Sequence, residues 1–495
     1  MREVRLGLLL ALTACGTEVP LGFHADGTCG DGGVAGLGLD PSFGSCGTAV
    51  IDVGGIDNVE LGTQGLAIDA QGRVLLAGTG GTPADTDLTV VRLLASGERD
   101  VSFGNQGAGS LTVTPGDHGA AVLVQPDGRI VVAGRLTTIG NEPIALVGRL
   151  LDDGRPDTTF GTDGTAKGAL ALGVSGTCEG ISRRADGVLL CSGTTYPTFP
   201  SNSDAAVLSF SAAGAQQGGI GIDWFMRGER GGAAVLAGDG KVVVPVTAGH
   251  PLRGEDFAVA RLDTNGALDP TFTDASGLAG RVSADFEGEK DTLQAVFVQP
   301  DGVIWAMGRA TMNGPTQTGV EAGAVVRWLP SGALDTSFGS GGRLLLLVRG
   351  WKTVWAVLPL EDGTFLLGGD AQTARGDLAL ALQVVDVKGE AAGPLQVVDL
   401  SPGDDSVRTL VSDAARGHVY VLGVTGGGTG DNDWVVQRLI PEAKRVGLGN
   451  TCAAAPAGPL LLVLLARTIS TRVRSRSRTK PHEGLRGGAG AGERV

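Results

Sequence analysis

Two short apolar runs flank a turn signal in residues 120–134, AAVLVQPDGRIVVAG. The runs are rich in Val, and the Pro-Asp-Gly between them favours a tight turn, because Asp and Gly tolerate the positive φ that such turns demand. The pattern therefore predicts a β-hairpin. It recurs at steps of 53 to 62 residues, with turn glycines at Gly72, Gly128, Gly187, Gly240, Gly302, Gly363 and Gly417.

Two other parts recur in phase with the hairpin. One is a strand that ends in Arg-Leu, such as DFAVARL at 256–262, and the other is a linking motif, such as LDTSFGSGG at 334–342. In DFAVARL both alternating faces are apolar, with Phe257 on one face and Ala258 on the other. Burial on both faces is what a sheet packed between two neighbouring sheets requires.

A unit of about 57 residues with about four strand-like runs has the size of a four-stranded propeller blade. Seven units over residues 39–443 therefore predict an all-β, seven-bladed β-propeller. The repeat starts with the linking motif at Leu39 and stops after the Arg438-Leu439 strand, so it is cut between two of its parts. We expect a strand near 48–53 to close the ring by pairing with the final blade around 434–439.

Taken together, the LDxSFGxxG motif, the hairpin around PDG and DFAVARL resemble the delta-60 repeat family of exported bacterial, myxobacterial-type proteins. The resemblance covers residues 39–443. It implies a propeller fold and an exported location, and it carries no agreed catalytic residues.

The N-terminus reads as an export signal, with two arginines ahead of an apolar run from Leu6 to Leu12. The segment from Leu12 to Cys15 resembles a lipoprotein lipobox, so residues 1–15 are interpreted as a signal peptide and Cys15 as the lipidated residue. An ordinary secretory signal is the alternative. The resemblance implies a lipid anchor on a membrane surface of the bacterial cell envelope. Residues 16–38, which are glycine-rich, are interpreted as a tether.

Cysteine pairs persist in the oxidising compartment that an exported chain reaches. Cys29 and Cys46 are the expected disulfide, closing a glycine-rich loop. Cys178 and Cys191 flank one hairpin, but counting outward from its turn puts Ser182 opposite Cys191. This register argues against a second bridge.

The formal net charge of -14 is unevenly distributed, because the C-terminal tail is basic. An acidic body repels phosphates, so we expect no nucleic-acid partner. Residues 444–495 combine an apolar run at 459–466, too short to span a membrane, with an arginine-rich end. They resemble a myxobacterial C-terminal sorting tail in part, and a disordered basic tail is the other interpretation.

The Arg-Leu strand repeats an aspartate at its start and an arginine five residues later. A residue repeated once per blade is spread around the ring, whereas catalysis needs different groups at one point. We therefore expect a structural role, with Asp capping loop amides and Arg joining neighbouring blades. The aspartates are Asp87, Asp204, Asp256, Asp377 and Asp433, and the arginines are Arg92, Arg149, Arg261, Arg327 and Arg438.

The sequence lacks the HExxH, GxSxG, GxxxxGK[ST] and CxxC signatures of common hydrolases, nucleotide-binding proteins and thiol enzymes. We assign no catalytic residue, metal or cofactor. The favoured function is a monomeric, non-catalytic scaffold or binding module for a protein or carbohydrate ligand. The alternative is a hydrolase or lyase whose carboxylates, such as Asp117, Asp291 or Glu255, meet at the channel mouth.

Overall fold

The computed structural model describes residues 33–441, except 35, 54–62, 83–84, 115, 139–141, 170–174, 199–201, 225–227, 251–253, 287–289, 313–318, 348–349, 402 and 427–431. The chain divides into two compact units, Met1–Cys452 and Ala453–Val495. The expected lipidation site Cys15, the residue Cys29 and the C-terminal tail lie outside the described residues. Within the described ranges no helix combines the length and the hydropathy that a membrane span needs.

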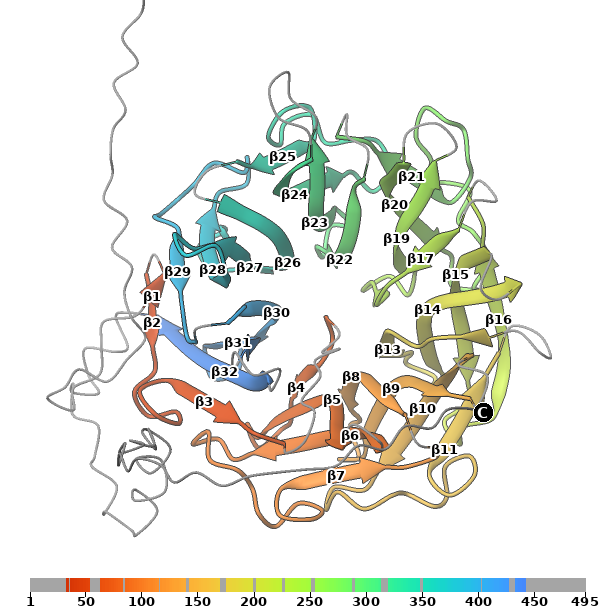
Figure 1. The fold of residues 1–495 in the computed structure, drawn as a ribbon. Helices are drawn as coiled ribbons and strands as arrows, with labels where there is room; N and C mark the ends of the chain where they lie inside the picture. Colours follow the sequence, from red (N-terminus) through yellow and green to blue (C-terminus); the bar gives the residue numbers. More distant parts are fainter. Residues whose placement is uncertain are drawn as a thin grey trace, which may run out of the picture. The chain divides into compact units, whose positions relative to one another are not determined.

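Seven antiparallel sheets are arranged in a ring, which confirms the predicted seven-bladed β-propeller (Figure 1). Blade 1 is β4 (Leu66–Ile68), β5 (Val74–Thr82), β6 (Asp85–Leu93) and β7 (Ala108–Leu111). Blade 2 is β8 (His118–Val124), β9 (Ile130–Thr137), β10 (Pro143–Leu150) and β11 (Thr165–Gly168). Blade 3 is β12 (Ser175–Gly176), β13 (Gly180–Arg183), β14 (Leu189–Thr198), β15 (Asn202–Phe210) and β16 (Gln216–Ile222).

Blade 4 is β17 (Glu229–Gly231), β18 (Val235–Leu236), β19 (Val242–His250), β20 (Gly254–Leu262) and β21 (Arg281–Ala284). Blade 5 is β22 (Thr292–Val298), β23 (Ile304–Met312), β24 (Val320–Trp328) and β25 (Arg343–Leu346). Blade 6 is β26 (Trp351–Pro359), β27 (Phe365–Gln372), β28 (Leu378–Val385) and β29 (Gln396–Val398). Blade 7 is β30 (Ser406–Asp413), β31 (His418–Gly426) and β32 (Asn432–Pro441), completed by β1 (Gly33–Val34), β2 (Leu37–Leu39) and β3 (Thr48–Ile51).

The last blade is closed by the N-terminal segment, as the cut repeat predicted. Strand β3 pairs antiparallel with β32, so that Ile51 lies opposite Trp434. Strand β2 pairs with the far end of β32, where Leu37 lies opposite Pro441. Within the described residues the sheet starts at Gly33, so the end of the segment interpreted as a tether belongs to blade 7 instead. Val34 and Leu37 are buried there, which explains why the sheet extends beyond the repeat.

The core consists of seven layers between adjacent blades. Alternate residues of β20 show the arrangement: Phe257 and Val259 pack with residues of blade 5. Ala258 and Ala260 pack with residues of blade 3. The expectation that this strand is buried on both faces is confirmed, because all four side chains are inaccessible to solvent.

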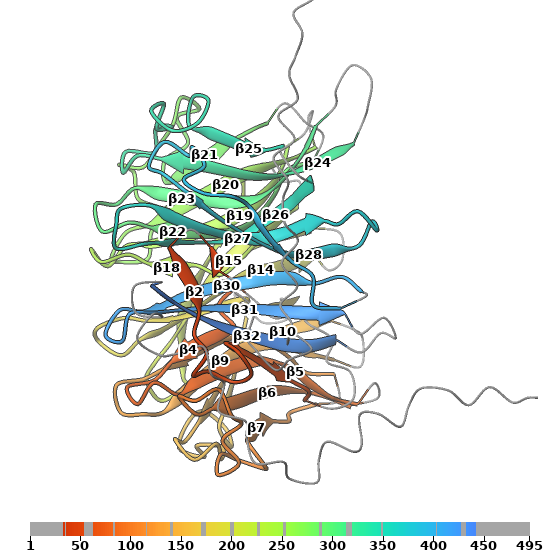
Figure 2. The same ribbon diagram turned by 90° about the vertical axis from the view of Figure 1, so that its left-hand side faces the viewer.

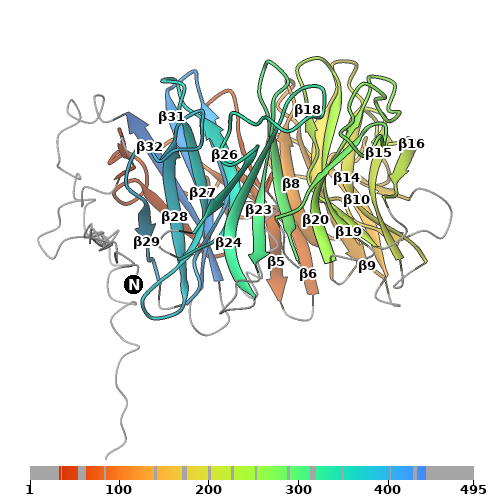
Figure 3. The same cartoon turned by 90° about the horizontal axis from the view of Figure 1, so that it is seen from above.

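Strands run from one end of the ring to the other (Figures 2 and 3). The innermost strand of each blade leads into the Asp-Gly-type hairpin turn, and we call the end of the ring with these turns the turn end. The second strand returns to the opposite end, where the loop to the third strand lies. We call that opposite end the loop end.

Candidate functional site

The turn end is built from one unit that repeats in five blades. In each unit the arginine of the Arg-Leu strand binds the aspartate of the linking motif and stacks over the phenylalanine of that motif, and we call the unit an Arg–Asp–Phe latch. The Nε of Arg261 donates to Asp269 at 2.9 Å, and its guanidinium carbon lies 4.4 Å from the Phe272 ring centre. The other latches are Arg92–Asp100–Phe103, Arg149–Asp157–Phe160, Arg327–Asp335–Phe338 and Arg438–Asp40–Phe43.

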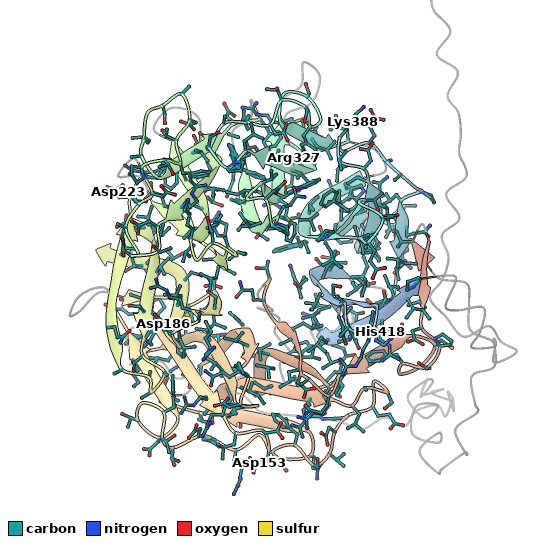
Figure 4. The ribbon with its side chains drawn as sticks, turned by 180° about the vertical axis from the view of Figure 1, so that it is seen from behind. Asp153, Asp186, Asp223, Arg327, Lys388 and His418 are labelled. Carbon is teal, nitrogen blue, oxygen red and sulfur yellow. A yellow bond between two sulfur atoms is a disulfide. The ribbon has the colours of Figure 1, made fainter. Side chains whose placement is uncertain are left out.

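Each latch arginine also reaches the next blade. The Nη1 of Arg261 donates to the carbonyl oxygen of Pro330 at 2.6 Å, and that of Arg149 donates to the carbonyl oxygen of Ala212 at 2.6 Å. The expectation that these arginines join neighbouring blades is therefore confirmed. Figure 4 shows Arg327 within the body of the ring, where its latch lies.

The latch aspartates are held ionised. Burial raises the pKa of Asp157, but the hydroxyl and backbone N–H of Thr159 and the charge of Arg149 outweigh it and lower this pKa to about 2. The same balance lowers the pKa of Asp269, where the hydroxyl and N–H of Thr271 act together with Lys241 and Arg261. These repeated carboxylates serve the architecture rather than a reaction.

The three carboxylates of the enzyme hypothesis do not meet. Asp117 is fully buried, and its Oδ2 accepts the backbone N–H groups of Val113 and Thr114 at 2.7 and 3.0 Å. Asp291, which is 1% exposed, accepts the N–H of Phe286 at 2.9 Å. Asp117 and Asp291 stand at matching loops of different blades, and both cap backbone amides.

Glu255 is engaged in ion pairs instead. One of its oxygens lies 3.2 Å from Arg230 and 3.9 Å from Lys290. None of Asp117, Asp291 and Glu255 lines either of the two large cavities described below.

Carboxylates gather at two matching places near the loop end. Among the described residues, Asp204, Asp223 and Glu229 form one group and Asp256, Asp285 and Asp291 form the other, each with oxygens within 4.8 Å of one another. Burial, together with the charges of Asp285 and Asp256, raises the pKa of Asp291 to about 6 against the lowering effect of two backbone hydrogen bonds. Carboxylate oxygens suit hard cations in general. The recurrence of these groups in adjacent blades is typical of a repeated structural feature.

The innermost strands contain an irregularity in strand pairing that the repeat analysis missed. Pairing with the second strand shifts register at the same repeat position in each of β8, β22, β26 and β30, so that one residue is left out of the ladder there. Strand β26 has a second shift, which leaves out Lys352. A β-bulge of this kind redirects the side chain of the extra residue. The residues left out at the shared repeat position are Ala120, Gln294, Trp355 and Arg408.

The same position interrupts the inner strand in the remaining blades. Glu179 lies in the gap between β12 and β13, and Gly232 lies in the gap between β17 and β18. Gln64 precedes β4 in blade 1. All seven residues stand eight positions before the turn glycine of their blade, except Arg408, which stands nine before it. The position repeats, but the side chain differs in almost every blade.

The Gln64 side chain crosses to two other blades. Its Nε2 donates to the carbonyl oxygen of Ala234 in blade 4 at 3.0 Å. Its Oε1 accepts the N–H of Ile181 in blade 3 at 2.9 Å. Figure 1 shows the start of β4 reaching toward the ring centre, in agreement with this bridge. We call the Gln64 side chain with these two hydrogen bonds the Gln64 bar.

A cavity of about 660 Å³ occupies the ring centre. Five of the seven residues at the bulge position line it: Glu179, Gly232, Gln294, Trp355 and Arg408. Arg135, Tyr196 and Arg230 complete its polar and aromatic wall. We call it the channel cavity, and its size is typical of small-molecule sites.

A second cavity, of about 750 Å³, lies at the loop end of blades 5 to 7, and we call it the loop-end cavity. Its wall includes Arg309, Glu321, Lys352, Gln372, Asp404 and Asn432. Trp355 and Arg408 line both cavities, so the two cavities adjoin at this pair.

Trp355 and Arg408 are held as a unit. The guanidinium carbon of Arg408 lies 4.3 Å from the centre of the Trp355 ring, a cation–π contact. The indole Nε1 of Trp355 and the hydroxyl of Ser406 both donate to Oδ1 of Asp370, at 2.5 and 2.9 Å. Burial raises the pKa of Asp370, while these hydrogen bonds and the charge of Arg408 oppose the rise.

Arg408 keeps hydrogen-bonding capacity for a ligand. Arg408 lines both cavities, and none of the hydrogen bonds found among the described residues involves its guanidinium. In the same part of the chain, no carboxylate oxygen lies within 4.0 Å of the Arg408 guanidinium or the Lys352 ammonium, whereas Arg309 pairs with Glu321 at 3.0 Å. An unpaired, half-buried arginine suits an anionic group, because a guanidinium binds carboxylates and sulfates with two parallel hydrogen bonds.

Disulfides differ in part from the sequence expectation. Cys178 and Cys191 are bonded, with Cα atoms 5.5 Å apart, so the argument against this bridge was wrong. The strand register explains the error: Cys191 lies opposite Ile181, and the interruption of the inner strand brings Cys178 beside it. Cys46 is disulfide-bonded, and its expected partner Cys29 lies outside the described residues.

Comparison with known proteins supports the β-propeller fold and does not assign a function. The profile of a β-propeller domain of unknown function, DUF5122, matches residues 125–160, 237–272 and 299–338. No curated protein matches the chain.

Three solved structures are similar in fold at low identity. A protein of unknown function from Dyadobacter fermentans DSM 18053 has 13% identity and a TM-score of 0.45, covering 82% of this chain and 100% of that one. The polysaccharide lyase Uly1 has 12% identity and a TM-score of 0.47, covering 77% and 90%. An ulvan lyase of family PL25, bound to a GlcA–sulfated rhamnose unit, has 10% identity and a TM-score of 0.49, covering 80% and 96%.

Proposed function

We propose that this propeller is an exported, lipid-anchored binding module that takes an anionic ligand into its channel cavity without reacting with it. The observation that carries the proposal is Arg408, which stacks on Trp355 and lines both cavities where they adjoin. A cation placed in this way is complementary to a carboxylate or sulfate.

The charge distribution supports this choice of ligand. The chain as a whole has a formal charge of -14, yet the described residues that line the channel cavity include Arg135, Arg230 and Arg408 and one carboxylate, Glu179. Arg230 is also paired with Glu255, which does not line the cavity. A cleft with an excess of one sign within low-dielectric walls focuses the field and raises the local concentration of oppositely charged ligands. An acidic exterior also disfavours long polyanions such as nucleic acids from wrapping around the ring.

A binding role agrees better with these contacts than hydrolysis or elimination does. The carboxylates suggested for catalysis are either capped by backbone amides, as Asp117 and Asp291 are, or ion-paired, as Glu255 is. A general acid and base must lie within reach of one reacting bond. These three side chains line neither cavity.

Location and assembly state are parts of the same proposal. The lipobox-like segment ending in Cys15 supports an anchor in the cell envelope, and a rigid ring held at a membrane surface would present its channel to the exterior. The propeller closes on its own N-terminal segment, so a monomer is sufficient for the site.

Binding to a panel of polymers tests the proposal. The full chain is immobilised, and polygalacturonate, sulfated dextran and neutral dextran are passed over it at several salt concentrations. We expect the two acidic polymers to bind and neutral dextran not to bind. Removing the hydrogen bonds of one charged group costs roughly 1.5–3 kcal/mol, so Arg408→Gln should weaken acidic-polymer binding by about ten- to hundredfold.

The matched control is Arg155→Gln. Arg155 is exposed and pairs with Asp153, which lies at the outer rim of the ring in Figure 4. This control should bind like the unchanged protein. Equal losses in both variants, or equal binding of neutral and acidic dextrans, would contradict the proposal.

A further inference from the structure

The two cavities adjoin at one pair of residues. The channel cavity and the loop-end cavity share Trp355 and Arg408, which are successive inner-strand bulges of blades 6 and 7. A ligand that fills only one cavity would touch this pair from one side. A ligand that continues from the loop end into the ring would use both sides.

The channel cavity is bounded on the turn-end side by the Gln64 bar. The channel cavity is lined in blades 3 and 4 as far as Glu179 and Ala233. The bar is bonded to Ile181, two positions after Glu179, and to Ala234, the position after Ala233, both toward the turn end. Thr63, the neighbour of Gln64, also lines the cavity. A chain that enters from the loop end therefore meets the bar at the bottom of the channel cavity.

From this geometry we infer that the ligand is the end of an acidic polysaccharide chain, which enters at the loop end, passes Trp355 and stops at the Gln64 bar. The inference rests on the proposed function and adds the ligand class and its direction. Each cavity is the size of a small-molecule site, at about 750 and 660 Å³. Together they hold several linked sugar units rather than one.

The wall chemistry selects a sugar over an acidic peptide. The loop-end cavity mixes the cation Lys352 and the amides of Gln372 and Asn432 with the carboxylates of Glu321 and Asp404. A uronate unit matches this mixture, because its carboxylate meets the cations while its hydroxyl groups donate to the wall carboxylates. Glutamate side chains have no donor when ionised, so an acidic peptide would bring its charges against Glu321 and Asp404.

Trp355 adds an apolar surface where the two cavities adjoin. A pyranose ring presents C–H groups on its faces, and an aromatic side chain with one polar edge suits a partner that is part apolar and part wet. The hydrogen bond from its Nε1 to Asp370 fixes the orientation of the indole. Asp370, which is 3% exposed, is therefore a positioning residue for the ring.

Calorimetric titration of the full chain with oligogalacturonates tests the inference. The probes are a trisaccharide, short enough for one cavity, and a decasaccharide, long enough for both. We expect the decasaccharide to bind at least about tenfold more tightly, because each engaged subsite adds contacts without a new cost of association. One protein should bind per chain end, so the stoichiometry should stay at one protein per chain when long polygalacturonate replaces the decasaccharide.

Two variants test where the polysaccharide chain binds. Lys352→Gln should reduce the advantage of the decasaccharide over the trisaccharide several-fold, because Lys352 lines the loop-end cavity only. Arg230→Gln should weaken both oligomers, because Arg230 lines the channel cavity. The control Arg155→Gln should leave both affinities and their ratio unchanged, and thermal unfolding of each variant checks that the ring is intact.

The outcomes separate this inference from the proposed function. Equal affinities for the two oligomers, or several proteins bound along each long polymer, would overturn the chain-end inference while leaving an anionic site in the channel. Poly-L-glutamate binding as tightly as a uronate chain of equal charge would overturn the sugar assignment. Failure of every acidic polymer to bind would remove the proposed function and this inference with it.

Discussion

The Nε of Arg438 lies 2.8 Å from Oδ2 of Asp40, and this contact joins residues 398 positions apart. Every other Arg–Asp–Phe latch joins an arginine to an aspartate only eight positions further along the chain. The same type of contact therefore joins residues close in sequence in four latches, and in the fifth it joins the two ends of the repeat and closes the ring.

Removing the closing latch should destabilise the ring more than removing a local one. Loss of one partner from a buried ion pair costs about 3–5 kcal/mol, because the remaining charge is left uncompensated. Arg438→Gln should lower the free energy of unfolding by this amount and also weaken the attachment of strands β2 and β3. Arg327→Gln is the control, since the Arg327 side chain is only 13% exposed and pairs with Asp335. Urea unfolding measures both, and a smaller cost for Arg438→Gln than for Arg327→Gln would be inconsistent with latch closure.

The N-terminal strands should be needed for stability, whereas the residues before them should not. Deleting 33–53 removes β1, β2 and β3 and exposes the edge of β32, including the partners of Ile51 and Leu39. We expect a drop in melting temperature well beyond that caused by deleting 16–32. Circular dichroism melts of the two deletions make the comparison, and equal shifts would refute closure through β3.

Asp291 should give the stability an unusual acid dependence. Its pKa in the folded chain is raised to about 6, above the unfolded value of 3.8, so the folded state binds the proton more tightly. The contribution of Asp291 to the free energy of unfolding is then greatest below pH 4. It falls by roughly 2–3 kcal/mol as the pH rises toward 6, because each pKa unit corresponds to about 1.36 kcal/mol. Asp291→Asn should flatten the profile between pH 4 and 6 in denaturant titrations.

Asp157 provides the opposite sign in the same experiment. Its pKa is lowered to about 2, so its stabilisation is present above pH 4 and is lost as pH falls from 4 to 2. Asp157→Asn should therefore reduce the acid sensitivity below pH 4 and leave the region between pH 4 and 6 unchanged. If both variants altered the same pH region, the assignment of the two pKa shifts would be wrong.

The Cys178–Cys191 disulfide should stabilise blade 3. The two cysteines are 13 residues apart, and closing a loop of this size contributes about 3 kcal/mol in the chain-entropy treatment. The double variant Cys178→Ala/Cys191→Ala should lose a similar amount, and reduction of the unchanged protein should cost at least as much, because it also opens the bridge of Cys46. Peptide mapping under non-reducing conditions should recover 178 and 191 in one linked fragment. Two separate fragments would contradict the bridge.

The location proposal has its own test. Cys15→Ser should move the protein from the membrane fraction to the soluble exported fraction, because no acyl chain can then be attached at that position. Fractionation and immunoblotting follow the change. Continued membrane association of the variant would transfer the anchoring role to another segment.

Periodicity predicted the fold because all seven blades repeat the turn glycine and five of them repeat the latch arginine and the latch phenylalanine. Backbone geometry and blade packing require these residue types, and both are repeated around the ring. The closing strand was predictable for the same reason, since the cut between Leu39 and Leu439 leaves one blade incomplete.

The candidate site was not predictable in that way. Trp355 and Arg408 lie at a repeating position, but their chemistry does not repeat, so a search for recurring motifs passes over them. The usable signal was the non-repeating residue eight or nine positions before each turn glycine. Even so, strand pairing was needed to show that this position is a bulge and that the two side chains line both cavities.

The inner-strand bulge separates what holds the ring together from what the ring displays. Because the extra residue takes no part in the ladder, its side chain can change without cost to the pairing on either side of it. Five of the seven residues at this repeat position line the channel cavity, so the chemistry of its wall can change one residue at a time while the strand pairing is kept. Substituting Gln294 would change which ligands the same scaffold prefers, and the architecture that identifies this protein would not reveal the change.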